Sequence, residues 1–213
     1  MLISIDIGTT YSSMSILGPD EKPIPVAIGE DGTGWGSKYS LPTAIFVEEN
    51  GEVLIGQAAM RSRMRNPSCF CMEFKRNFGE NEPKLIGNCS FKVEELYTEV
   101  FLHMKNCLKG LSHEQVEKVY LTYPATYGKD KKERLFTAAK AAGFLHVELI
   151  EEPKAAAISY CMDSYIKEGQ IFLVYDFGGG TFDAALVKYE PSRYSRKYCL
   201  VPCRRYWRCS ISI

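Results

Sequence analysis

Two glycine-rich turns, each flanked by strand-like segments, recur in this chain. The first lies in SIDIGTTYSSMSIL, residues 4–17, and the second in VYDFGGGTFDAALV, residues 174–187. The two segments align without a gap at an offset of 170 residues, and each has an apolar run ending in aspartate, a Gly-Thr turn and a second apolar run. Short apolar runs around a tight turn are typical of β-hairpins. One such turn is an ordinary hairpin feature, whereas two in register indicate a repeated functional element.

Both turns have the chemistry of phosphate binding. Glycine lets an anion approach the backbone without meeting a Cβ, so turn amides can point together at phosphate oxygens. The threonine hydroxyls add further donors. An aspartate beside a phosphate is expected to orient a hydrated cation such as Mg²⁺. Two facing turns therefore predict a clamp for a polyphosphate and its metal.

Alternating strands and helices are expected between the two turns. Besides the first hairpin, strands are expected at residues 24–28, 43–47, 53–55, 119–122, 147–150, 171–175 and 182–188. Helices are expected over residues 94–108, which have one apolar face, over residues 130–142, which stop at Gly143, and from Pro153 onward. This alternation predicts an α/β fold with a partly parallel sheet.

The composition is that of an ordinary globular chain, but its charge is unevenly distributed. Of 213 residues, 46% are hydrophobic and 24% are charged, which argues against a disordered or collagen-like chain. The net charge of zero hides six basic residues against one acid in residues 189–213. That segment shows neither strand alternation nor a helical stripe, so it is expected to be an atypical basic tail from an out-of-frame or truncated end. Nucleic-acid binding is not expected of a tail without a fold to display it.

Sequence features also predict the compartment. Met1 is followed at once by apolar residues, with no basic region or cleavage site of a signal peptide. No run approaches the roughly 18 apolar residues of a membrane span. The expectation is a cytoplasmic protein with no membrane partner. The eight cysteines are then expected to be free thiols, and none has zinc-ribbon spacing.

The two turns resemble the phosphate motifs of the seventy-kilodalton heat-shock chaperones, the DnaK-like family within the actin and sugar-kinase ATPase superfamily. Further similar segments follow in the family's order at residues 54–59, 66–67, 74–79, 122–125 and 152–157. The resemblance covers residues 1–188 and implies an actin-like (ribonuclease H-like) ATPase fold, a mixed sheet with flanking helices. It implies lobe I over residues 1–170, with a subdomain inserted at about 30–110, and the first hairpin of lobe II over residues 171–188.

The resemblance also implies roles for individual residues. Phosphate contacts are implied for Gly8, Thr9, Thr10, Tyr11, Gly178, Gly179, Gly180 and Thr181. The implied catalytic residues are Lys75, which would reach the γ-phosphate and attacking water, Glu152, which would position metal-bound water, Asp176 and Thr181. Asp6 and Asp176 would orient Mg²⁺ through water, and Pro124 would couple nucleotide state to a substrate domain. Taken alone, Lys75 is typical of a solvated surface, Glu152 of a helix start and Pro124 of a strand end.

The resemblance implies an ATP-binding and ATP-hydrolysing domain of a molecular chaperone, with ATP or ADP and Mg²⁺ as ligands. The full-length family works with unfolded polypeptide, a J-domain co-chaperone and a nucleotide-exchange factor. The chain departs from the family at Gly128, Lys129, Glu151 and Lys154, which leaves the phosphate contacts untouched but bears on the coupling. It lacks the adenosine-binding motif of lobe II, so weak or absent hydrolysis is expected. Two alternatives remain open: a non-catalytic nucleotide-binding or interaction fragment, and a sugar-kinase-like phosphotransferase, against which residues 74–76 and 152–153 argue.

Overall fold

The computed structural model describes residues 1–109, 111, 115–163, 167–178, 181–191, 198–202 and 209–212. The chain divides into two compact units. Met1–Leu121 and Tyr127–Leu149 form the first unit, and Thr122–Thr126 and Ile150–Ile213 form the second. The expected lobe boundary at residue 170 does not coincide with this division, because the helix before it packs with the hairpin after it. The lobe assignment stays a prediction.

A six-stranded mixed sheet is the centre of the first unit. Its strands are β1 (Leu2–Ile7), β2 (Tyr11–Leu17), β3 (Pro23–Pro25), β4 (Leu41–Pro42), β10 (Lys118–Tyr123) and β11 (Val147–Glu151). Their order is β11-β10-β1-β2-β3, and β4 pairs with β2. The β1 strand runs parallel to β10 and antiparallel to β2, which confirms the expected hairpin and the partly parallel sheet.

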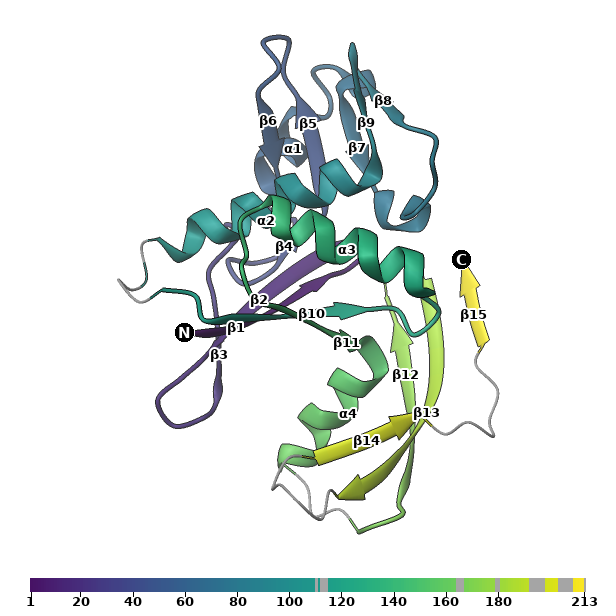
Figure 1. Cartoon of the computed structure of the whole chain (residues 1–213). Coiled ribbons are helices and arrows are strands. Elements are labelled where there is room, and N and C mark those ends of the chain that lie inside the picture. The colour runs from purple at the N-terminus through teal and green to yellow at the C-terminus, as the bar shows by residue number, and fades with distance from the viewer. Residues whose placement is uncertain are drawn as a thin grey trace. The chain divides into compact units, whose positions relative to one another are not determined.

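Two helices of the first unit lie side by side over one face of this sheet (Figure 1). They are α2 (Val93–Leu108) and α3 (Lys129–Ala141), and both agree with the expected helices to within one residue at each end. The apolar face of α2 is fully buried, including Tyr97 and Phe101. Gly143, with φ of 83°, follows α3 in the left-handed conformation that commonly ends a helix.

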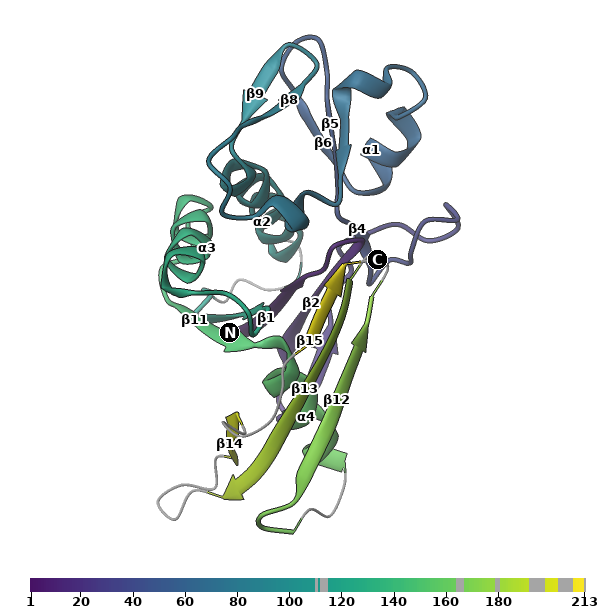
Figure 2. The same ribbon diagram turned by 90° about the vertical axis from the view of Figure 1, so that its right-hand side faces the viewer.

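Short elements complete the first unit (Figure 2). A three-stranded sheet has the order β6-β5-β7, and β8 pairs with β9. These strands and the short helices around them are β5 (Ala44–Val47), β6 (Val53–Ile55), α1 (Gln57–Ser62), η1 (Pro67–Cys69), β7 (Phe70–Met72), η2 (Phe74–Asn77), β8 (Lys84–Ile86) and β9 (Cys89–Phe91). Sequence periodicity predicts only β5 and β6, since the others are too short to show a pattern.

The strand expected over residues 24–28 is a partial error. The strand itself is confined to β3, and the last backbone bond to β2 runs from the N–H of Val26 to the carbonyl of Met14 at 2.9 Å. The backbone N–H of Ile28 instead donates to the carbonyl of Lys38, 2.8 Å away. The apolar run therefore leaves the sheet to begin a loop, because its backbone groups find partners within that loop.

The second unit is built on a long antiparallel hairpin of β12 (Ile171–Phe177) and β13 (Thr181–Pro191). Helix α4 (Glu152–Asp163) packs on it, with Ala157 and Val187 buried together. Strands β14 (Tyr198–Pro202) and β15 (Cys209–Ser212) both pair with β13, and the side-chain pattern of their sequence did not indicate them. Strand pairing uses backbone amides and carbonyls, which every sequence supplies whether or not its side chains alternate.

Two further features of the structure concern membrane spans and cysteine thiols. Within the described residues, no helix is long and apolar enough to cross a membrane. The described cysteine side chains are all free thiols: Cys69, Cys71, Cys89, Cys107 and Cys161. Burial raises the pKa of the Cys71, Cys107 and Cys161 thiols, which lowers their reactivity at neutral pH.

Candidate functional site: two glycine-rich turns with their acidic and threonine side chains

The first glycine-rich turn joins β1 to β2 so closely that no side chain fits at its first position. A Cβ added to Gly8 would lie 2.1 Å from the backbone oxygen of Tyr11. No real Cβ sits that close to a backbone oxygen, so the turn needs glycine for space. The absent side chain lets the chain turn this tightly, and glycine-rich turns can direct backbone amides at an anion.

The two threonines of the first turn have buried hydroxyls without an observed partner. Oγ1 of Thr9 and Oγ1 of Thr10 are shielded from solvent and have no hydrogen-bond partner among the described residues. An unsatisfied buried hydroxyl costs about 1–3 kcal/mol, so each one calls for an explanation. A bound anion would accept from both hydroxyls, and the pair therefore fits a phosphate.

A carbonyl of the first turn accepts a hydrogen bond from the segment between β4 and β5. The backbone N–H of Thr43 donates to the carbonyl of Thr10 at 2.8 Å. The hydroxyls of Ser12 and Thr43 hydrogen-bond to each other at 2.7 Å in the buried interior. Tyr11 begins β2 and is 41% exposed, and Asp6 lies in β1 opposite Ser13 of β2. The implied phosphate residues of this turn therefore form one local group with Asp6.

Lys75 lies in the first unit on the one-turn helix η2. Its neighbours Phe74 and Phe78 are fully buried and fix the turn in place. Their rings pack on Tyr97 with centroid distances of 5.8 and 4.6 Å, and Phe78 also stacks on Tyr127 at 5.5 Å. Because the turn is held rigidly, the backbone position of Lys75 is fixed, whatever ligand its charge contacts. Its contact with phosphate stays a prediction.

The second glycine-rich turn lies in the second unit between β12 and β13. Asp176 is directly opposite Asp183 across the two strands, and Phe177 is opposite Phe182. Gly178 is exposed at the end of β12. The implied phosphate residues Gly179 and Gly180 lie outside the described residues, and only the backbone of Thr181, at the start of β13, is described.

Three carboxylate residues line one small pocket of the second unit. They are Glu152, Asp176 and Asp183. The pocket has a volume of about 20 Å³, which is room for about one water molecule. Ala125 and Thr126, which directly follow Pro124, also line it. The structure thus brings together Glu152 and Asp176, which the sequence analysis assigned to the same metal-bound water.

Asp183 is a site residue that the sequence analysis quoted without giving it a role. Its signal is the register of the hairpin, since a turn of this length places the residue seven positions after Asp176 directly across from it. Like charges directly opposite each other are unfavourable in a sheet. A bound cation would offset that repulsion. Asp176 and Asp183 therefore suit a metal site better than they suit the stability of the hairpin.

The acidic residues fit a hydrated cation better than a direct metal cage. Among the described residues, no three His, Cys, Asp or Glu side chains gather closely enough to hold a metal ion directly. Mg²⁺ commonly keeps several of its waters and contacts one or two carboxylates. A role for Asp6 and for Asp176 in that mode stays a prediction, while the Thr9 and Thr10 hydroxyls suit phosphate oxygens.

The sheet, its helices and the two turns define the class of α/β ATPase domains that bind nucleotide phosphates. A family model for the Hsp70 protein matches residues 80–195. The chaperone protein DnaK of Mycoplasmopsis pulmonis (strain UAB CTIP) is 30% identical over 190 residues, which are 89% of this chain and 30% of that protein. DnaK of Endomicrobium trichonymphae is 31% identical over 188 residues, 88% of this chain and 30% of that protein. The chain therefore belongs to the Hsp70 family and represents a divergent N-terminal ATPase-like region of it.

These matches confirm the resemblance and the chaperone ATPase fold that it implied. The family match runs to residue 195, beyond residue 188 where the likeness was expected to stop. The chain spans about 30% of the length of the curated relatives that it matches.

Proposed function

We propose that this chain binds ATP and ADP with Mg²⁺ and that, in the whole protein, the bound ATP is hydrolysed to drive a chaperone cycle on unfolded polypeptide. The observation that carries the proposal is the pair of buried, unpartnered hydroxyls of Thr9 and Thr10 on a turn with no space for a side chain at Gly8. The buried hydroxyls are a cost without a ligand, and a bound anion would accept hydrogen bonds from both.

The proposed roles fall to the two glycine-rich turns, to Lys75 and to the acidic residues. The first turn, with Gly8 and the two threonines, donates hydrogen bonds to phosphate oxygens, while Lys75 places a positive charge at the terminal phosphate. Glu152 would help position metal-bound water, and it lines the same small pocket as Asp176. Mg²⁺, held through water by Asp6 and Asp176, would neutralise phosphate charge. Thr181, Gly178, Gly179 and Gly180 would close on the phosphates from the second turn.

Replacing both threonines of the first turn with valine separates binding from stability. In the variant Thr9→Val/Thr10→Val, we expect affinity for MgADP to fall at least about 100-fold, because each of the two lost hydrogen bonds to a charged group contributes about 1.5–3 kcal/mol. The free energy of unfolding without nucleotide should stay equal or rise, since two unsatisfied buried hydroxyls are removed. Titration calorimetry and urea unfolding measure the two quantities.

The matched control is Thr43→Val, which also replaces a buried threonine near the turn. It leaves the Ser12 hydroxyl without its partner at 2.7 Å, so unfolding free energy should fall by about 1–3 kcal/mol. MgADP affinity should fall less than in the double variant. A double variant that binds MgADP as tightly as the wild type would contradict the proposed phosphate contacts.

A second candidate function is nucleotide binding without turnover. The observation that favours it is an apolar face of β12 that is exposed in this chain, with Leu173, Tyr175 and Phe177 each more than half accessible. A complete two-lobed cleft would cover such a face, and an incomplete one loses much of the positioning on which phosphoryl transfer depends.

Lys75→Ala distinguishes the two functions. If the chain hydrolyses ATP, the variant should lose at least about 100-fold in single-turnover rate, because a positioned charge at the transferred phosphate is removed. The control Lys22→Ala removes an exposed lysine in the turn before β3 and should leave the rate unchanged. Nucleotide binding with no turnover in the wild type supports the second function, and phosphate transfer that requires a sugar would support a sugar-kinase activity.

Further parts of the proposal concern the whole protein. By its family, it would work with a J-domain co-chaperone and a nucleotide-exchange factor in the cytoplasm, and Pro124 would couple nucleotide state to the substrate domain. Pro124 immediately precedes Ala125 and Thr126, which line the pocket with Glu152 and Asp176. That position supports a coupling role, because a shift at the pocket reaches the proline through two residues.

A further inference from the structure

A glycine-rich loop of the first unit, residues 29–40, lies between β3 and β4. We call it the Trp35 loop. Its backbone takes positive φ at Gly32, Gly34 and Gly36, with values of 74°, 76° and 78°. The loop nevertheless closes on itself, because the N–H of Gly29 donates to the carbonyl of Lys38 at 2.9 Å. None of the proposed phosphate contacts explains this ordered loop.

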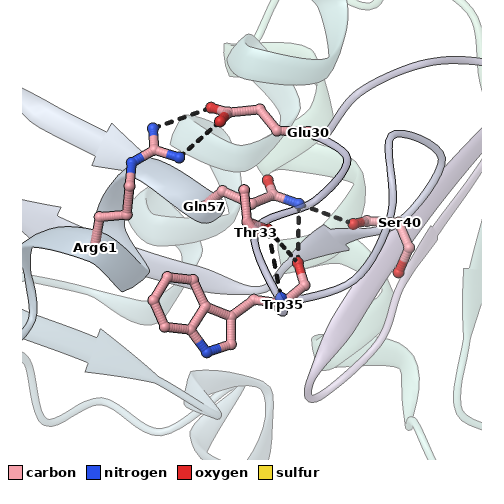
Figure 3. Close-up of polar contacts among 6 residues, drawn as sticks. All are labelled: Glu30, Thr33, Trp35, Ser40, Gln57 and Arg61. Carbon is pink, nitrogen blue, oxygen red and sulfur yellow. Dashed lines mark hydrogen bonds and ion pairs between the residues drawn. The ribbon is translucent and has the colours of Figure 1, made fainter.

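Gln57 fastens the Trp35 loop from inside (Figure 3). Gln57 is the first residue of α1, and only 2% of it is exposed. Its Nε2 donates to the carbonyl of Trp35 at 3.1 Å and to the carbonyl of Ser40 at 3.3 Å. A Cβ added to Gly29 would lie 2.8 Å from the same nitrogen, so the loop closes tightly around the amide.

The tryptophan itself is held from several sides. Its backbone N–H donates to Oγ1 of Thr33 at 3.3 Å, and the guanidinium of Arg63 lies 5.3 Å from the centre of its ring. The ring also packs on the buried cluster that includes Phe46 and Met60. Trp35 is therefore a fixed point of the loop, and its indole is a natural spectroscopic probe of it.

The far end of the loop meets the first phosphate turn. A Cβ added to Gly36 would lie 3.1 Å from Cε1 of Tyr11 and 2.6 Å from the carbonyl oxygen of Ser40. Directly after Ser40 the chain enters β4, which pairs with Tyr11 and Ser12 of β2. One residue beyond β4, the N–H of Thr43 donates to the carbonyl of Thr10. A continuous chain of contacts thus runs from Gln57 through Ser40 to the turn.

We infer that Gln57 is a positioning residue for nucleotide, which acts through the Trp35 loop and β4 to set the first phosphate turn. The inference rests on the proposed phosphate site. By linkage, a ligand that fixes the turn also fixes the loop, so MgADP should change the surroundings of Trp35. Gln57 touches no phosphate in this arrangement, and its effect on binding is indirect.

The test compares the full chain with Gln57→Met, which keeps the length of the side chain and removes both donors. Two quantities are measured: the hydrogen-exchange rate of the Thr43 amide without nucleotide, and the affinity for MgADP. We expect the variant to exchange this amide about tenfold faster and to bind MgADP about tenfold more weakly. In a Trp207→Phe background, which leaves Trp35 as the one tryptophan, MgADP should shift indole emission, and Gln57→Met should remove the shift.

The matched control is Arg61→Ala. Arg61 lies on the same helix and holds the same loop through Glu30, with nitrogen–oxygen distances of 2.6 and 3.1 Å. This pair is half-exposed, and its two hydrogen bonds join Arg61 to Glu30 and not to Trp35 or Ser40. It should change exchange and affinity less than about twofold. If Gln57→Met does not fold, Gly36→Ala replaces it, since its Cβ would lie 2.6 Å from the Ser40 carbonyl oxygen that accepts from Gln57 and would disturb the same route.

The outcomes separate this inference from the proposed function. A wild-type chain that binds no MgADP overturns the proposed function, and faster exchange at Thr43 in Gln57→Met then still supports the link between loop and turn. Unchanged exchange in a folded Gln57→Met overturns the inference, even where MgADP binds tightly. Weaker MgADP binding with unchanged exchange of the Thr43 amide also overturns the inference, because Gln57 would then affect binding by a route other than β4.

Discussion

Gly8→Ala is expected to abolish measurable MgADP binding, with an affinity loss on the order of 100-fold or more. The added Cβ would lie 2.1 Å from the backbone oxygen of Tyr11, so the turn must open to accept it. Opening the turn moves the Thr9 and Thr10 hydroxyls, which are the proposed donors to phosphate. Titration calorimetry at millimolar MgADP measures the loss.

A second glycine provides the control for this substitution. Gly128, just before α3, has no atom within 4 Å of an added Cβ and does not have positive φ. Gly128→Ala should bind MgADP as the wild type does. Wild-type affinity in Gly8→Ala would show that the first turn does not approach phosphate, and the proposed site would have to be abandoned.

The largest loss of stability is expected from Phe78→Ala. Phe78 is completely buried, stacks on Tyr127 at 5.5 Å and packs on Tyr97 at 4.6 Å. Truncating such a ring to alanine removes about 3–5 kcal/mol from the free energy of unfolding. The same change releases η2, so any turnover that depends on Lys75 should fall as well. Urea unfolding followed by circular dichroism measures the stability.

Phe136→Ala is the control for Phe78→Ala. Phe136 lies on α3 in the same unit, and 38% of it is exposed, so its truncation removes little buried surface. We expect a loss below about 1 kcal/mol. Similar losses in the two variants would mean that η2 is not anchored by its phenylalanines.

Most long helices and strands could be predicted, because the spacing of their apolar side chains is also what makes them pack as helices and strands. The apolar stripe of residues 94–108 is the buried face of α2, and the alternation of β1 places Ile3, Ile5 and Ile7 in the core. Strands β14 and β15 could not be predicted from pattern, because strand pairing uses backbone groups that every sequence supplies. The same reason explains the missed β4, a two-residue strand recruited by β2.

The candidate site was predicted residue by residue only where a motif carried it. The turn at Gly8 and the carboxylates of Glu152 and Asp176 come from motifs. Asp183 was left without a role, because its relation to Asp176 is a matter of register across two strands. Gln57 was also missed, since a glutamine in an apolar segment gives no signal until the loop folded around its amide is seen.

The repeated glycine turns, with the motifs between them, therefore determined the family by sequence alone. They also predict phosphate chemistry, because that chemistry depends on residue type within a few consecutive positions. Only the tertiary structure decided what surrounds each turn: the unpartnered hydroxyls of Thr9 and Thr10, the carboxylates around one small pocket, and the loop held by Gln57. Burial and long-range hydrogen bonds join residues that are far apart in the chain. No local pattern records them, because they arise when separate segments pack together.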